Sequence, residues 1–415
     1  MYNTIFYIII WLFVFEFILS KTLDYLNTLN WSTKLPEELK DIYDEDKYSK
    51  SMEYEKVKHT FSSISGMFSF LIMLLVLIFW GFGYLYDTIA LYTANEIYRT
   101  LWFFWFIMIL QSIIWLPFSY YSIFVIEEKF WFNKMTKKLF FIDSVKSLLL
   151  SVIIWGLLLS LITWIYLETG ANFWLYTWWV VTFFSVFMMM FYSSLIVPLF
   201  NKQTPLEKGE LRTEIEKFAN KVWFKLDNIF VIDWSKRSSK ANAYFSGFGP
   251  KKRIVLYDTL IKDLSVSELV GVLAHEIGHY KRKHTLQMLA FWTIQTGIML
   301  YILGITLSMD EISIALWSDK WSFAVWMVAF GILYTPISIF FWLMWNVLSR
   351  KNEYQADEFA WQYHNSSDLK NALIKLSRNN LSNLRPHPAY EFFNYSHPTV
   401  LKRLSALDKI EKKQD

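Results

Sequence analysis

Long apolar stretches limit what this chain can fold into. Seven stretches contain no Lys or Arg, at about residues 4–20, 61–86, 101–126, 147–167, 172–200, 285–309 and 321–349. Each is close to the roughly 20 residues that a helix needs to cross a bilayer. Charged residues make up only 19% of the chain, against about 25% in soluble proteins. The sequence therefore predicts a mainly α-helical membrane protein with seven spans.

The basic residues predict the orientation of these spans. Of the 41 Lys and Arg residues, all but Arg99 and Lys320 lie in the segments 21–60, 127–146, 201–284 and 350–415. Because cytoplasmic loops are enriched in Lys and Arg, we expect an N-terminus outside and a C-terminus in the cytoplasm. The first span lacks the basic start and cleavage site of a signal peptide and should remain in the protein. No basic run outside the spans is interleaved with aromatic residues, so no nucleic-acid partner is expected.

The chain divides into four predicted regions. Residues 1–200 hold five spans with their cytoplasmic loops, and residues 285–349 form a hairpin of two further spans. Residues 201–284 and 350–415 are predicted to be the two parts of one cytoplasmic α+β domain. Within the first part, the pattern predicts an amphipathic helix at residues 211–224. It also predicts strands at 228–233 and 253–260, with a strand and turn between them at 242–252.

A helix with metal-binding spacing is predicted next. It begins at Ser265, which has capping-box spacing with Glu268, and continues through "HEIGH" at 275–279. His275 and His279 are four residues apart, so they project from one face and can bind one metal ion. The chain has no Cys, and neutral imidazole suits Zn²⁺. One zinc per chain is therefore predicted, with Glu276 as the base that accepts a proton as water attacks a carbonyl.

A zinc site needs a third protein ligand. Glu353 and Asp357 are four residues apart on a predicted helix after the seventh span. One carboxylate would bind the metal and the other would hold the second ring nitrogen of a histidine; the spacing leaves open which does which. The remaining histidines are expected to be ordinary polar or turn residues: His59, His284, His364 and His387.

Five motifs resemble those of a known family. They are "FVIEEKFWFNKMT" at 124–136, "RSSKANAYFSGFGPKKRIVLYDTL" at 237–260, "HEIGH", "NEYQAD" at 352–357 and "SHPTVLKRL" at 396–404. Together they resemble the integral-membrane zinc proteases of the CAAX prenyl protease type 1 family, over nearly the whole chain. The resemblance implies a barrel of seven helices around a water-filled chamber, closed on the cytoplasmic side by the zinc domain.

The resemblance also implies roles for individual residues. It implies that Glu353 is the third zinc ligand, Glu276 the catalytic base and Asp357 the partner that orients a ligand histidine. Residues implied to bind substrate or stabilise the oxyanion are Asn242, Ala243, His397 and Arg403.

The substrate and the membrane are less narrowly defined by the sequence. Peptide or protein substrates held at the bilayer are expected, C-terminally lipidated CAAX-type substrates among them. Trp131 and Lys240 stand where eukaryotic members usually have Gly and His, and the segments 23–31 and 35–51 resemble bacterial members. This favours a bacterial plasma membrane and a task in membrane-protein quality control. In a eukaryote, the terminal "KKQD" would match a dilysine signal for the endoplasmic reticulum membrane.

Two alternative functions are open to a chain of this kind. A transporter or channel with a regulatory cytoplasmic metal site predicts several charged residues in the spans, but only Glu16 is found there. An intramembrane protease with its metal helix in the bilayer is disfavoured by "YKRKH" at 280–284. If the metal helix continues through these residues, the zinc lies at the cytoplasmic face of the membrane. Attachment of the substrate to the bilayer should then determine cleavage efficiency.

Overall fold

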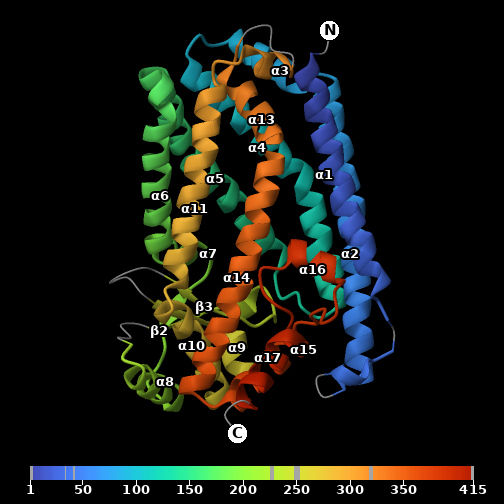
Figure 1. Cartoon of the computed structure of the whole chain (residues 1–415), viewed down its shortest axis with the longest axis vertical. Coiled ribbons are helices and arrows are strands. Elements are labelled where there is room, and N and C mark those ends of the chain that lie inside the picture. Colours follow the sequence, from blue (N-terminus) through green and yellow to red (C-terminus); the bar gives the residue numbers. More distant parts are fainter. Residues whose placement is uncertain are drawn as a thin grey trace.

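The long helices run along one axis of the molecule, with the N-terminus at one end and the C-terminus at the other (Figure 1). The computed structural model describes residues 3–32, 34–40, 43–224, 229–246, 253–316 and 321–412. The turn expected at 247–252 and the last three residues of the tail lie outside the described residues. The small sheet and the helices that surround it occupy the end of the molecule where the C-terminus lies (Figure 1).

Six helices among the described residues are long and apolar enough to cross a membrane. They are α1 (Thr4–Leu29), α2 (Glu45–Ile78), α4 (Glu96–Tyr121) with the π-helical turn Ser122–Glu127, α5 (Lys137–Thr169), α6 (Phe173–Leu195) and α11 (His284–Thr306). Shorter helices at their ends are α3 (Gly81–Ala90), α7 (Val197–Phe200) and α12 (Asp310–Ile314). Turns of 3₁₀ helix are formed by Glu37–Leu39, Gly170–Asn172 and Trp234–Lys236.

The seventh span is broken. The stretch predicted at 321–349 forms α13 (Phe323–Leu333) and α14 (Thr335–Tyr363), which meet at an angle of 56°. Pro336 lies in the first turn of α14. Its ring nitrogen has no hydrogen to donate to the preceding turn, so it favours the start of a new helix over the continuation of the old one. Counting the bent pair as one span gives the seven that the apolar stretches predict.

A four-stranded sheet lies at one end of the long helices (Figure 1). Its strands are β1 (Gln203–Pro205), β2 (Ile229–Ile232), β3 (Ala243–Ser246) and β4 (Arg253–Tyr257), in the order β1-β2-β4-β3. β2 and β4 are parallel, and the other two pairs are antiparallel. The strand predicted over 253–260 ends at Tyr257, because α9 (Asp258–Asp263) begins there. β3 is an edge strand, so one side of its backbone has no partner within the sheet.

One apolar core joins the segments before and after the last two spans. It includes residues of α8 (Glu210–Lys221), α10 (Val266–Lys281), α15 (Ser366–Asn379) and α17 (Val400–Glu411). Ile215, Leu273 and Leu407 are examples, each 1% exposed or less. The short helix α16 (Pro388–Asn394) lies between these elements and the spans, next to α14 and α1. The two segments, although separated by a membrane hairpin, therefore fold against each other.

The metal helix does not continue into the membrane. α10 ends at Lys281, and α11 begins at His284. Between them Lys283 has a φ of 60°, in the left-handed region that stops a right-handed helix. A continuous helix through 280–284, the condition stated above, is therefore not found, although the metal helix and the span are still separated by only two residues.

Candidate active site

The helix that carries the histidines begins with the expected cap. The Ser265 side chain accepts a hydrogen bond from the backbone N–H of Glu268, and the Glu268 carboxylate accepts one from the backbone N–H of Ser265. This reciprocal pair satisfies two of the free N–H groups at the start of α10. Lys375 of α15 pairs with the same carboxylate at 2.7 Å. The cap thus joins the start of the metal helix to the segment after the spans.

α10 crosses α14 at very short range. The crossing occurs at Gly278, where a Cβ atom would lie 3.1 Å from the Ala356 backbone oxygen and 3.2 Å from its Cα. Ala356 lies between Glu353 and Asp357 on α14. Because Gly278 has no side chain, the two helices come close enough for carboxylates of one to reach histidines of the other.

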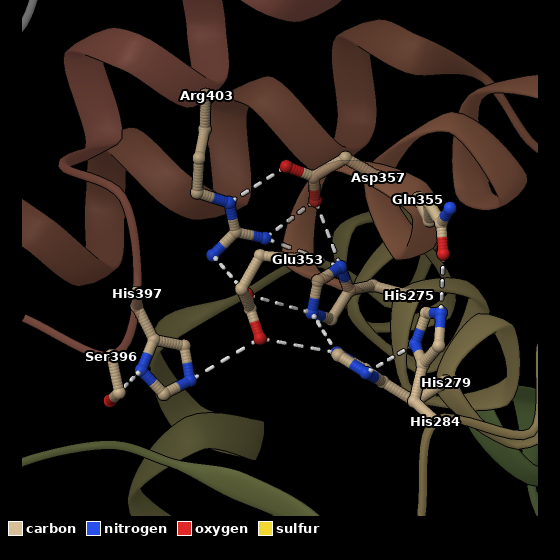
Figure 2. A network of polar contacts seen from close by, with 9 residues as sticks. All are labelled: His275, His279, His284, Glu353, Gln355, Asp357, Ser396, His397 and Arg403. Atoms are coloured by element: carbon tan, nitrogen blue, oxygen red, sulfur yellow. Dashed lines mark hydrogen bonds and ion pairs between the residues drawn. The ribbon is translucent and has the colours of Figure 1, made fainter. Parts of the chain in front are cut away.

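Three electron-pair donors converge at this crossing (Figure 2). The Nε2 atoms of His275 and His279 are 3.1 Å apart. In the Glu353 carboxylate, Oε2 lies 3.5 Å from the first and Oε1 lies 3.3 Å from the second. Ligands in a tetrahedron around one zinc ion, each about 2.0–2.1 Å from it, are about 3.3 Å from one another. The separations of the three donors therefore fit a single zinc ion.

The carboxylates around His275 favour positive charge at its ring. Burial and the positive charge of Arg403 lower the pKa of His275, but hydrogen bonds to Asp357 and Glu353 outweigh them and raise it to about 9. The two carboxylates thus favour positive charge at this ring. A divalent cation shared by the three donors would supply that charge, and zinc prefers this set of nitrogen and oxygen ligands.

The second ring nitrogen of His275 is held by a buried ion pair. Asp357 accepts a hydrogen bond from His275 Nδ1 at 2.8 Å. Arg403 donates to both oxygens of Asp357, from Nε at 2.8 Å and from Nη2 at 2.6 Å. Burial lowers the pKa of Arg403, but the charge of Asp357 outweighs it and raises that pKa above its usual value. With Nδ1 as the donor, His275 Nε2 can present its lone pair to a metal ion that displaces the proton on that atom.

The second ring nitrogen of His279 has a different partner. Its Nδ1 lies 3.0 Å from Nδ1 of His284, and the other nitrogen of His284 lies 2.9 Å from Oε1 of Gln355 (Figure 2). His284 is only 2% exposed. The expectation that His284 is an ordinary polar residue is therefore wrong. His364 and His59 do lie apart from the site, and His387 caps α16.

A cavity of about 430 Å³ opens beside the three donors. Glu276 lines it next to the histidines, and Asn242 and Ala243 line it at the start of the edge strand β3. His397 also lines it, with Nε2 3.3 Å from the Glu353 carboxylate and a side chain that is 62% exposed. The cavity thus brings together every residue that the sequence suggested for metal binding and catalysis, with the exception of Asp357, which lies behind His275.

Comparison with known proteins places this geometry in a family. Residues 24–202 match the family described as "CAAX prenyl protease N-terminal, five membrane helices", and residues 205–411 match peptidase family M48. The CAAX prenyl protease 1 homolog of Dictyostelium discoideum is 37% identical over 91% of this chain and 90% of its own length. CAAX prenyl protease 1 of Saccharomyces cerevisiae is 34% identical, over 92% and 90%.

The crystal structure of Ste24p from S. mikatae has the same fold. It is 34% identical in sequence, with a TM-score of 0.91 over 98% of this chain and 99% of that chain. The chain belongs to peptidase family M48. This M48 peptidase is a multi-pass membrane metalloendopeptidase, and the expected barrel of seven spans is consistent with the match. The family implies a bound metal, and His275, His279 and Glu353 form a group that could hold it. A transporter or channel with a regulatory metal site is thereby disfavoured.

Two features of the site were missing from the sequence analysis. Gly278 was not recognised as a crossing point, although a glycine between two ligand histidines indicates close helix packing. His284 was not linked to His279 because a spacing of five residues on a continuous helix places side chains about 140° apart. Only the break at Lys283 allows the contact.

Proposed function

We propose that this M48 peptidase binds one zinc ion through His275, His279 and Glu353 and hydrolyses peptide bonds in substrates held at the membrane. The convergence of two ring nitrogens and one carboxylate, at separations that fit one zinc ion, is the observation that carries this proposal. Zinc bound there would polarise the substrate carbonyl and lower the pKa of a water molecule.

Glu276 is the proposed general base. It follows His275 directly, lines the cavity and lies outside the group of three donors. A carboxylate in this place can take a proton from the attacking water and pass it to the leaving amine. Among the described residues that line the cavity, the other carboxylate is Glu353, which belongs to the proposed metal ligands.

The substrate backbone is proposed to lie along the edge strand. β3 begins at Ala243 and, among the described residues, pairs with a strand on one side only. Asn242 precedes it, is exposed, and lines the cavity. An extended peptide could add to this edge through main-chain hydrogen bonds, which select little by side chain. Asn242 and Ala243 would thereby bind many peptide sequences alike.

His397 and Arg403 are proposed to act differently from each other. His397 is exposed at the cavity and can donate a hydrogen bond to the oxyanion of a substrate. Arg403 is 9% exposed and bound to Asp357, with Nη1 3.4 Å from Glu353. Its charge would hold the carboxylates of Asp357 and Glu353 in place. We therefore assign Arg403 a positioning role, whereas the resemblance implied that it binds substrate or stabilises the oxyanion.

The position of the site suggests how substrates reach it. α11 begins five residues after His279, and α14 runs from the broken seventh span to Glu353. The metal site is thus attached to both helices of one membrane hairpin. Chains already anchored in the bilayer would reach it most readily, and the CAAX prenyl proteases among its relatives suggest C-terminally lipidated substrates. A role in quality control of membrane proteins would use the same access.

The orientation and the membrane are also proposed. The N-terminus and the C-terminus lie at opposite ends of the molecule, as expected for an outside N-terminus and a cytoplasmic zinc domain (Figure 1). The relatives named above come from eukaryotes. They favour the endoplasmic reticulum membrane over the bacterial plasma membrane that the sequence first suggested. The four regions 1–200, 201–284, 285–349 and 350–415 are proposed as the working division of the chain.

Metal analysis tests the ligand assignment. The purified protein is expected to hold one zinc per chain, and His279→Ala and Glu353→Ala are expected to lose it. His364→Ala is the matched control, since His364 contacts the Ser267 backbone oxygen and lies outside the cavity. A full equivalent of zinc in both ligand variants would refute the assignment.

Cleavage in proteoliposomes tests the substrate class. One peptide is compared with and without a C-terminal lipid. The anchored form is expected to have a kcat/KM at least about tenfold higher, because anchoring raises its effective concentration at the site. Equal kcat/KM values for the two forms would reject the proposed role of membrane attachment.

A further inference from the structure

The contact between His284 and His279 indicates which ring nitrogen of His279 carries a hydrogen. His284 is the first residue of α11, is 2% exposed, and touches both His279 and Gln355. It lies outside the group of donors that could bind a metal. Its position between a ligand histidine and an amide oxygen limits where its one ring hydrogen can be.

The Gln355 side-chain amide sets the direction of the hydrogen bonds from His279 through His284 to Gln355. Gln355 presents its oxygen, Oε1, to Nε2 of His284. An amide oxygen only accepts, so Nε2 of His284 carries the hydrogen. The two Nδ1 atoms are 3.0 Å apart and share a single hydrogen, and a neutral ring that carries its hydrogen on Nε2 has none on Nδ1. Nδ1 of His284 is therefore an acceptor, and the hydrogen in its contact with His279 belongs to His279.

This direction matters for the metal site. A neutral His279 with its hydrogen on Nδ1 has a lone pair on Nε2, the atom that faces His275 and Glu353. The opposite direction would place the hydrogen of His279 on Nε2, where it would block a metal ion. Only one of the two arrangements is compatible with metal binding, and it is the one that the Gln355 oxygen selects.

The break between α10 and α11 makes the contact possible. On an uninterrupted helix, His284 would point about 140° away from His279. The left-handed conformation at Lys283 interrupts the helix, and the first side chain of the membrane span contacts the metal helix.

We propose that His284 and Gln355 are positioning residues that hold His279 in its metal-binding tautomer. The inference rests on the proposed zinc site and deepens it. The support reaches His279 from the first residue of a membrane span and from α14, which also carries Glu353. Loss of such a partner typically weakens metal binding by about 10–100-fold while the ligands themselves remain.

Metal affinity provides the test, measured by competition with a chelator on the full-length protein. His284→Leu should still bind one zinc at saturation, about 10–100-fold more weakly. His284→Asn, whose side-chain oxygen can replace the Nδ1 acceptor, should recover most of the affinity. His59→Leu is the control, because His59 packs edge-on against Trp31 outside the cavity. The visible absorption spectrum of the cobalt-loaded protein should shift in His284→Leu and be restored in His284→Asn.

Variants of Gln355 test the direction of the proton chain. Gln355→Leu removes the acceptor for the His284 hydrogen and should lower zinc affinity, whereas Gln355→Glu keeps an acceptor and should lower it less. Equal losses in the two variants, or wild-type affinity and spectrum in His284→Leu, would overturn the inference. Failure of the wild-type protein to bind zinc would instead refute the proposed metal site, so the two failures are distinguishable.

Discussion

His275 and His279 face the same cluster of donors, but different supports stand behind them (Figure 2). Behind His275 lies an ion pair, Asp357 with Arg403, from α14 and α17. Behind His279 lies a neutral pair, His284 with Gln355, from α11 and α14. We call these the charged support and the neutral support.

The difference follows from where each support originates. The charged support comes from the segment after the last span, where Arg403 is 9% exposed and donates to both oxygens of Asp357. The neutral support includes the first residue of a membrane-spanning helix. A charged ring there would have to be buried, because His284 is only 2% exposed. One function, orienting a ring, is thus performed with charge on one side and without charge on the membrane side.

The substitution with the largest expected effect, on kcat, leaves both supports intact. Glu276→Gln should lower kcat by at least about 10²–10⁴-fold, because general-base assistance contributes about that much. Zinc content should remain at one per chain, since Glu276 is outside the donor group. Peptide cleavage and metal analysis on the same preparation check both points. Retention of a tenth of the wild-type kcat would show that another group is the base.

Removal of the charged support should cost both metal affinity and stability. Asp357→Asn leaves the buried Arg403 without its main anionic partner, and breaking a buried pair costs about 3–5 kcal/mol. We expect a lower Tm together with weaker zinc binding, in contrast to His284→Leu, which should mainly weaken zinc binding.

A surface carboxylate provides the control for that comparison. Asp408 pairs with Lys370 and its side chain is 54% exposed. Asp408→Asn should leave Tm and zinc affinity nearly unchanged, because exposed ion pairs contribute little. If Asp357→Asn behaved like Asp408→Asn, the distinction between the two supports would be wrong.

A change at the helix crossing should affect both supports at once. Gly278→Ala would place a Cβ 3.1 Å from the Ala356 backbone oxygen and push α10 away from α14. Forcing an extra methyl into a packed contact costs about 1–3 kcal/mol. We expect a lower Tm and weaker zinc binding.

The matched control is Gly331→Ala in α13, where no described atom beyond the adjacent residues and the local helix backbone lies within 4 Å of the added Cβ. That substitution should keep zinc affinity and leave Tm unchanged or slightly raised. A Gly278→Ala variant with unchanged zinc affinity would mean that α10 and α14 need not approach so closely.

The smallest expected effect is at the far end of the metal helix. Ser265→Ala removes the cap of α10, which should cost about 1 kcal/mol of stability. Both histidines lie at least ten residues from the cap, so zinc affinity should change little. Thermal unfolding with and without zinc measures both quantities; a loss of zinc affinity as large as that of His284→Leu would show that the cap controls the ligands.

Several elements could be predicted from sequence because their causes are local. The apolar lengths predict the spans, and the spacing of Ser265 and Glu268 predicts the cap that the structure contains. The strand at β2 follows from its apolar pattern. The bend at Pro336 was missed because apolar composition contains no information about direction. The position of β3 at the sheet edge depends on pairing with β4, which no local pattern determines.

The sequence by itself determined which residues could share a metal, because a spacing of four residues places His275 and His279 on one helix face whatever surrounds them. It also determined that they stand next to a membrane span. Only the tertiary structure decided which hydrogen-bond partner each ring receives. The second nitrogen of a ligand histidine points away from the metal, toward whatever packs behind its helix. For His275 that is Asp357, 82 residues later in the chain, and for His279 it is His284, brought back by one left-handed residue.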